Sequence, residues 1–175
     1  MLTVLAYARD LADWLGIDHM ELHNFRPSVR PVPLECHISR YPGKHYCPRM
    51  ATINKTTFQR IKQHCPTKPS LIFVSSRRQT RLTAINMISF LAGKDNPKQC
   101  LHMDDEEMER IISTIKDQNL RLTLAFGIGI HHAGLVERDR KTVEELYVNM
   151  KIQVLVATAT LALGINFPTH PLIHS

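Results

Sequence analysis

Three short apolar runs form the clearest pattern along this chain of 175 residues, and each of them ends in polar or glycine residues. They cover residues 70–75, 127–135 and 152–157, and branched apolar side chains dominate them. Runs of this length and composition are typical of strands that are covered on both faces, as in a parallel sheet. We therefore predict three buried strands at these positions.

Apolar residues recur at helical spacing between the runs, which predicts helices at residues 54–65, at 80–92, after Asp104 and from about Glu137. Asp104 and Glu107 have the spacing of a capping box. The predicted buried faces are Phe58, Ile61 and Cys65; Leu82, Ile85, Ile88 and Leu91; Met108, Ile111, Ile112 and Ile115; and Val143, Leu146, Tyr147 and Met150. Alternating strands and helices predict an α/β fold, a mostly parallel sheet with helices on both faces.

The first forty residues follow a different pattern. Residues 4–15 predict a helix with Leu5, Ala8, Ala12 and Leu15 on one face and Gly16 as its stop. Three prolines exclude a helix at 24–33 and indicate a linker. Residues 34–38 alternate apolar and polar side chains, which predicts a half-exposed strand.

Polar side chains cluster where the predicted strands end, and ligands of open α/β sheets bind at the carboxyl ends of strands. Arg77, Arg78 and Arg81 follow the first strand, in a chain of formal net charge +6 and pI near 9.3. Hydroxyls of Thr158 and Thr160 follow the third strand and can donate to phosphate oxygens. A polyanion is therefore the expected partner.

The segments LIFVSSRRQTR, GIGIHHAGL and VLVATATLALGINFP resemble motifs IV, IVa and V of the Ski2-like branch of superfamily 2 helicases. The resemblance implies a RecA-like fold, the second lobe of an ATP-dependent motor that moves 3′ to 5′. It also implies that Gly164 and Asn166 face the nucleotide. The residues expected to contact nucleic acid are Ser76, Arg77, Thr80, His132, Gly134, Thr158 and Thr160.

The same resemblance divides the chain into the tail of a first RecA lobe at residues 1–22, a hinge at 23–33 and the second lobe at 34–175. The chain contains neither a G-x-x-x-x-G-K-[ST] loop nor an Asp-Glu box. We therefore expect a first lobe to bind most of the ATP and Mg²⁺, and we expect this chain alone to be inactive. The implied partners are single-stranded DNA or RNA, the first lobe and a multi-subunit complex, in the nucleus and cytoplasm.

The C-terminal end departs from the resemblance. Leu163 stands where a tryptophan is expected, and the arginine-bearing motif VI does not follow, so we expect an incomplete lobe. Pro171 interrupts the expected next strand. This interruption predicts that the strand at 152–157 lies at or near an exposed edge of the sheet.

Two alternatives remain open. A non-enzymatic lobe that binds nucleic acid or a partner weakly fits the same residues. A zinc site is the other alternative, and its candidate ligands are Cys36, His37, His45, Cys47, His64 and Cys65. These residues lack the short paired spacings of zinc modules. The cysteines show no disulfide pattern, and no apolar run is long enough for a signal peptide or a membrane span, so we expect a reducing compartment and no membrane.

Overall fold

A computed structural model describes residues 8–18, 22–23, 25–29, 36–42, 45–93, 96–158, 161 and 172–174 of the chain. The chain forms two compact units, Met1–Arg40 and Tyr41–Ser175. Each unit is described by itself. In the described ranges no helix is both long enough and apolar enough to cross a membrane.

The first unit contains helix α1 (Ala8–Leu15) and the 3-10 turn η2 (Pro27–Val29). Gly16 adopts a positive φ of 66°, and the N–H of Ile17 donates to the carbonyl of Ala12 at 2.9 Å. The predicted stop of the helix at Gly16 is confirmed, because this left-handed conformation is the one that glycine adopts readily after a helix.

The strand predicted at residues 34–38 is wrong where the structure describes it. Residues 36–40 are irregular, and the side chain of Ile38 is 97% exposed. Alternation of apolar and polar side chains needs a neighbouring strand and a core to become a strand, and the described part of the sheet offers no pairing partner to these residues.

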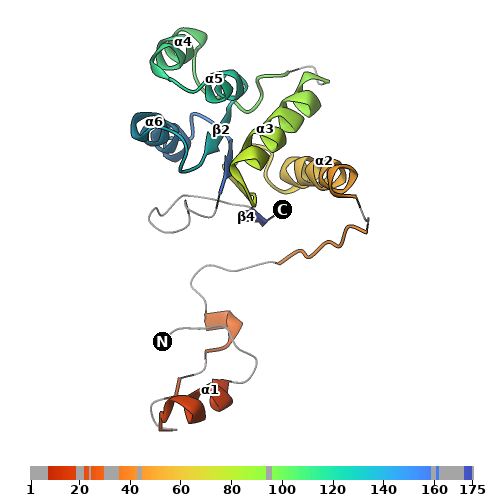
Figure 1. The fold of residues 1–175 in the computed structure, drawn as a ribbon, viewed down its shortest axis with the longest axis vertical. Helices are drawn as coiled ribbons and strands as arrows, with labels where there is room; N and C mark the ends of the chain where they lie inside the picture. Colours follow the sequence, from red (N-terminus) through yellow and green to blue (C-terminus); the bar gives the residue numbers. More distant parts are fainter. Residues whose placement is uncertain are drawn as a thin grey trace. The chain divides into compact units, whose positions relative to one another are not determined.

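The second unit is built on a four-stranded sheet in which all strands run parallel (Figure 1). Its strands are β1 (Ser70–Phe73), β2 (Ile128–His131), β3 (Val154–Ala157) and β4 (Leu172–His174), in the spatial order β2-β3-β1-β4. Every residue of β1, β2 and β3 is buried. The three predicted strands and the α/β fold class are confirmed.

The prediction that the strand at 152–157 lies near an exposed edge is wrong. Strand β3 is an interior strand, since β2 and β1 flank it and both precede it in the chain. Strand β4 begins at Leu172, directly after Pro171, and pairs with β1 instead. A proline before the first residue of a strand removes no ladder hydrogen bond from that strand, so Pro171 does not prevent the pairing.

The described residues of the second unit form five helices beside the sheet: α2 (Tyr46–His64), α3 (Arg77–Ala92), α4 (Asp105–Thr114), α5 (Gln118–Leu124) and α6 (Glu137–Val148). Helices α2 and α3 lie on one side of the sheet and α6 on the other (Figure 1). The four predicted helices of this unit exist, although α2 begins eight residues before the predicted start at residue 54. The sequence reading missed α5, whose seven residues are too few to show a clear period.

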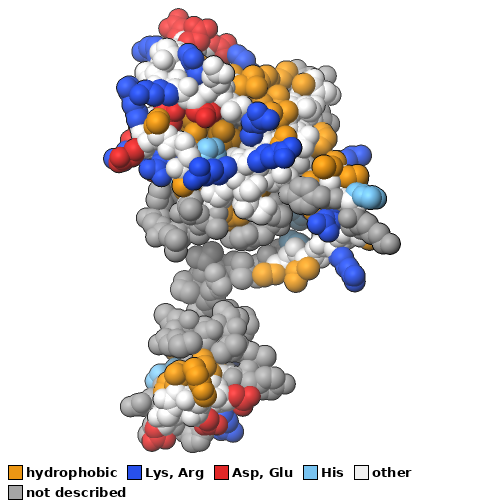
Figure 2. All heavy atoms as spheres, in the orientation of Figure 1, with side chains coloured by type: hydrophobic (Ala, Val, Ile, Leu, Met, Phe, Trp, Pro, Cys, Tyr) orange, Lys and Arg blue, Asp and Glu red, His pale blue; other side chains and the backbone are white. Residues whose placement is uncertain are grey.

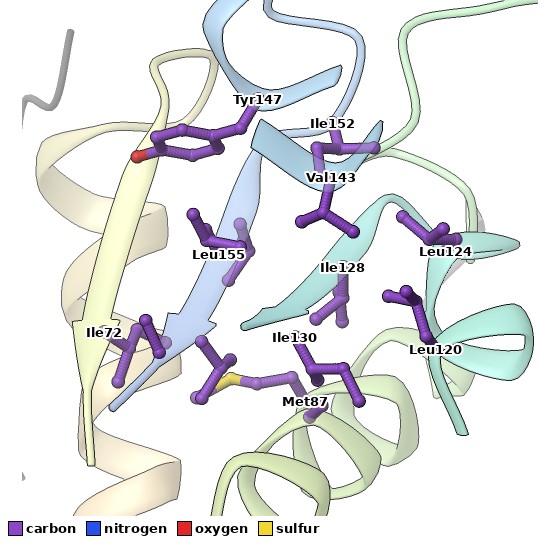
Figure 3. Close-up of a cluster of buried hydrophobic side chains, with 14 of the residues drawn as sticks. Ile72, Met87, Leu120, Leu124, Ile128, Ile130, Val143, Tyr147, Ile152 and Leu155 are labelled. Carbon is purple, nitrogen blue, oxygen red and sulfur yellow. The ribbon is translucent and has the colours of Figure 1, made fainter. Parts of the chain in front are cut away.

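The two faces of the sheet carry different parts of the core (Figure 3). Met87 of α3 lies near Ile130, whereas Val143 and Tyr147 of α6 lie near Leu155 on the opposite face. Gly129 makes the approach of α6 possible, because a methyl group at this position would lie 2.9 Å from Cγ1 of Val143. Side chains from both layers therefore bury the strands completely.

The buried faces of two helices differ from the predicted ones. Helix α3 buries Thr80, Thr83, Ala84, Met87 and Leu91, while Ile85 is 37% exposed. The polar members fit because helix α2 lies against this face, where Thr83 donates to Oδ1 of Asn54 at 3.4 Å. The sequence predicted Met150 on the buried face of α6. In the structure Met150 follows the end of this helix with a φ of 57°, and it is 47% exposed.

Helix α4 follows the prediction more closely. Met108 and Ile115 are buried, and Ile111 and Ile112 are packed against the core. Asp104 occupies the N-cap position as expected, but its side chain makes no capping hydrogen bond. The apolar period therefore identified this helix correctly, whereas the capping box did not form.

A buried carboxylate ties α6 to the turn between α4 and α5. Asp139 is 1% exposed, and its oxygens accept the backbone N–H groups of Lys116 and Asp117 at 3.1 Å. Asp117 in turn caps α5 by accepting the N–H of Leu120 at 2.9 Å. Asp139 therefore fixes the position of the α5 N-terminus relative to α6.

We expect Asp139→Asn to lower the free energy of unfolding by about 1–3 kcal/mol, because the amide replaces one acceptor with a donor that faces two N–H groups. Urea denaturation monitored by circular dichroism measures the change. Glu109→Gln, which alters an exposed carboxylate on α4, is the matched control and should shift the free energy by less than about 0.5 kcal/mol. Equal midpoints for the two variants would show that the tether contributes nothing.

Candidate nucleic-acid interface

The end of β1 passes directly into the N-terminus of α3. Ser76 is the N-cap residue, and its hydroxyl oxygen accepts the N–H of Gln79 at 3.3 Å. Arg77, Arg78 and Arg81 lie on the exposed surface of the first turns. An N-terminus with free N–H groups and exposed guanidinium groups attracts anions, because both carry positive charge.

Strand β2 ends at His131, and His132 begins the tight turn that follows it. His132 is half-buried, and its Nδ1 accepts the N–H of Gly134 at 3.1 Å. The carbonyl of His132 accepts the N–H of Leu135 at 3.1 Å. The turn therefore uses both the ring and the backbone of His132 to hold its shape.

The end of β3 lies between these two segments, as the order β2-β3-β1 requires. The N–H of Thr158 donates to the carbonyl of His131 at 3.1 Å, and the N–H of Val74 donates to the carbonyl of Ala157 at 2.9 Å. These two bonds extend the parallel pairing past the strands themselves. The polar residues that follow the three strands are thereby held along one edge of the sheet.

Arg77 and the histidine turn meet at this edge. A methyl group built on Gly134 would lie 3.0 Å from a terminal guanidinium nitrogen of Arg77 and 3.1 Å from Nδ1 of His132. The guanidinium is therefore in contact range of the turn. On the face drawn in Figure 2, several Lys and Arg side chains lie on the upper part of the second unit, with Asp and Glu side chains beside them.

The environment of His132 disfavours its charged form. Partial burial lowers the pKa of the ring below 6.5, and the charges of Arg77 and His131 act in the same direction. Asp117 opposes them, since its carboxylate raises the pKa, but burial is the largest cause. Burial therefore shifts His132 toward its neutral form.

His131, the last residue of β2, directs its side chain toward α6. Its ring is 5% exposed, and Nε2 lies 2.8 Å from Oε1 of Glu144 on α6. Its Nδ1 is buried without a hydrogen-bond partner in the described structure. His131 therefore connects α6, through its side chain, to the end of β3, through its carbonyl.

The structure brings together most of the described residues that the sequence predicted as contacts for nucleic acid. Ser76, Arg77, His132, Gly134 and Thr158 lie at the carboxyl edge of the sheet. Thr80 is not presented with them, because it is 0% exposed and its hydroxyl donates to the carbonyl of Arg77 at 2.6 Å. The predicted positions Thr160, Gly164 and Asn166, together with Leu163, lie outside the described residues.

Sequence reasoning missed two acidic residues at this edge, Glu144 and Asp117. Glu144 lies within a predicted helix with nothing to distinguish it from Glu145, and Asp117 precedes the helix that was not predicted. The N-cap preference of Asp117 was the one available signal. Among the described residues no three His, Cys, Asp or Glu side chains converge in a way that would hold a metal ion.

Known proteins match this chain closely. Activating signal cointegrator 1 complex subunit 3 from Bos taurus is 71% identical and the same subunit from Homo sapiens 70% identical, each over 98% of this chain. The DExH-box ATP-dependent RNA helicase DExH14 of Arabidopsis thaliana is 60% identical over the same share. The chain spans 8% of the length of each of these relatives. No family model matches the chain.

We expect Glu144→Ala to lower the free energy of unfolding by about 1–3 kcal/mol, because the buried His131 ring then loses its one hydrogen-bond partner in the described structure. Thermal and urea unfolding measure the loss. The exposed neighbour Glu145 offers a matched control, and Glu145→Ala should change stability by less than about 0.5 kcal/mol. If both variants unfold alike, the pair does not stabilise the fold.

Proposed function

Because this chain is homologous to a segment of Ski2-like helicases, we propose that its second unit is the second motor lobe of an ATP-dependent DNA or RNA helicase that moves 3′ to 5′. In this proposal the carboxyl edge of the sheet holds the phosphate backbone of a single strand. One observation carries the assignment: Arg77, His132, Gly134 and Thr158 converge at that edge.

The chemistry of the edge favours phosphate over bases. Arg77 supplies a charged fork of donors, and His132, Ser76 and Thr158 supply neutral donors. Among the described residues that converge there, none is Phe, Tyr or Trp, so contacts to phosphate are favoured over base stacking at this edge. Binding is therefore expected to be independent of sequence and sensitive to salt.

The nucleotide side of the proposal rests on the sequence motif. Gly164 and Asn166 would contact ATP, whose Mg²⁺ and phosphates need an acidic residue and a lysine loop from a first lobe. When bound, ATP supplies the phosphoryl group whose transfer to water drives the opening and closing of the cleft between the two lobes of the motor. The residues of the second unit hold the strand during these movements.

The names of the relatives support two further parts of the proposal. The first is membership of a multi-subunit complex, because the relatives are named as subunits of the activating signal cointegrator 1 complex. The second is RNA as one substrate, because the plant relative is named as an RNA helicase. A location in the nucleus and cytoplasm is proposed from the resemblance of the sequence motifs alone.

Binding of single-stranded RNA tests the interface. We expect weak binding whose log affinity falls linearly with log salt, and Arg77→Ala should flatten the slope by about 0.7, the value for one lost phosphate contact on a single strand. Fluorescence anisotropy over a salt series measures both quantities. Arg60→Ala is the control, since Arg60 is exposed near the end of α2 that leads to the opposite edge of the sheet. Equal slopes for parent and Arg77→Ala would remove Arg77 from the interface.

A second candidate function is binding without catalysis, and hydrolysis of ATP discriminates between the two. We expect the 175-residue chain to release phosphate no faster than buffer, with or without RNA, because it has no lysine loop for the phosphates. Joined to a first lobe and a complete second lobe, it should hydrolyse ATP, and Asn166→Ala should lower the rate. Turnover by the purified chain that Asn166→Ala abolishes would overturn the division of labour between lobes. Absence of turnover by the joined protein would favour the binding module.

A further inference from the structure

His132 carries one hydrogen bond that determines the chemistry of its ring. Nδ1 accepts the N–H of Gly134 at 3.1 Å, and a nitrogen that accepts has no proton of its own. The Arg77 guanidinium, which lies close to Gly134, can also only donate. The Gly134 N–H therefore favours a ring whose Nδ1 carries no proton.

From this geometry we propose that His132 binds a backbone phosphate as a neutral donor through Nε2–H, with its tautomer fixed by the Gly134 N–H. The inference deepens the proposed function and rests on it. In this arrangement Arg77 contributes a positive charge at the edge of the sheet, whereas His132 contributes an oriented hydrogen-bond donor that carries no charge. Binding by this histidine is then insensitive to pH around neutrality.

The surrounding charges agree with a neutral ring. Arg77 of α3, His131 of β2 and Asp117 at the N-cap of α5 are the charged or titratable groups that act on His132. Burial is the largest cause, and together with Arg77 and His131 it outweighs Asp117 and the backbone hydrogen bond of His132, so the pKa of His132 is lowered. Protonation would also place a proton between Nδ1 and the Gly134 N–H, so it would break the hydrogen bond that shapes the turn.

The lowered pKa has a consequence for stability. The unfolded chain takes up a proton on this ring at a higher pH than the folded chain does, so acidification favours unfolding. The contribution of neutral His132 is fully present above pH 6.5 and is lost as pH falls below that value. The parent should therefore lose more stability between pH 7.5 and 5.5 than His132→Gln does, since glutamine does not titrate.

Nitrogen NMR of the free, ¹⁵N-histidine-labelled chain at pH 7.5 tests the tautomer directly. We expect the ring of His132, assigned by its disappearance in His132→Gln, to carry its proton on Nε2 and none on Nδ1. A proton on Nδ1, or on both nitrogens, would overturn the inference. This measurement needs no nucleic acid, so its result is independent of the proposed function.

Binding of single-stranded RNA tests the role of the neutral donor. We expect His132→Ala to bind RNA about 2–10-fold more weakly than the parent, because it loses one hydrogen bond. The salt slope should stay the same, because the lost donor carries no charge. His132→Gln, whose amide offers a neutral donor, should recover most of that loss at pH 8 and at pH 6.5. A parent slope steeper than that of His132→Gln by about 0.7 would show that the histidine binds as a cation.

The two failures are distinguishable. If the parent chain does not bind RNA at all, the proposed function fails, and with it the phosphate role of His132, even where NMR finds the expected tautomer. The other outcome is that the parent binds RNA and that lowering the pH from 8 to 6 raises its affinity about tenfold relative to His132→Gln. In that case only the inference that His132 binds as a neutral donor is overturned.

Discussion

Parallel pairing of three strands that end at the same level is the constraint on which the rest of the second unit depends. The register matches Phe73 with Ala157 and Ala157 with His131, so the chain leaves all three strands along one edge. Backbone hydrogen bonds continue beyond the last paired residues, from Thr158 to His131 and from Val74 to Ala157. This backbone pairing thus holds residues that are far apart in the sequence along one edge of the sheet.

Burial on both faces gives this edge its rigidity. Gly129 lets α6 approach one face closely enough for Glu144 to reach His131, while α3 covers the other face and begins with Ser76 and Arg77. The same helices that bury the strands therefore also position the polar side chains at the strand ends. A change in the packing of α6 would alter the site as well as the core, because His131 belongs to both.

Much of this arrangement was predictable from the sequence. Short apolar runs with branched side chains identified β1, β2 and β3, and the polar residues after them identified the edge, because carboxyl ends of parallel strands meet. The helix faces were less predictable. Thr83 is buried on α3 and Ile85 is exposed, since α2 lies against that face and offers Asn54 as a partner. When apolar spacing alone is used, threonine counts as a polar residue, and Thr83 is therefore assigned to the exposed face of the helix.

The sequence by itself determined the positions of β1, β2 and β3 and the residues that follow them, because short runs of branched apolar side chains are local features of the chain. Only the tertiary structure decided the strand order, which places β3 inside the sheet and β4 beside β1. It also decided that Thr80 is buried, that Glu144 pairs with His131, and that Gly134 sets the proton on His132. These properties arise from contacts between segments or from the exact conformation of a turn, and no local pattern of residues encodes them.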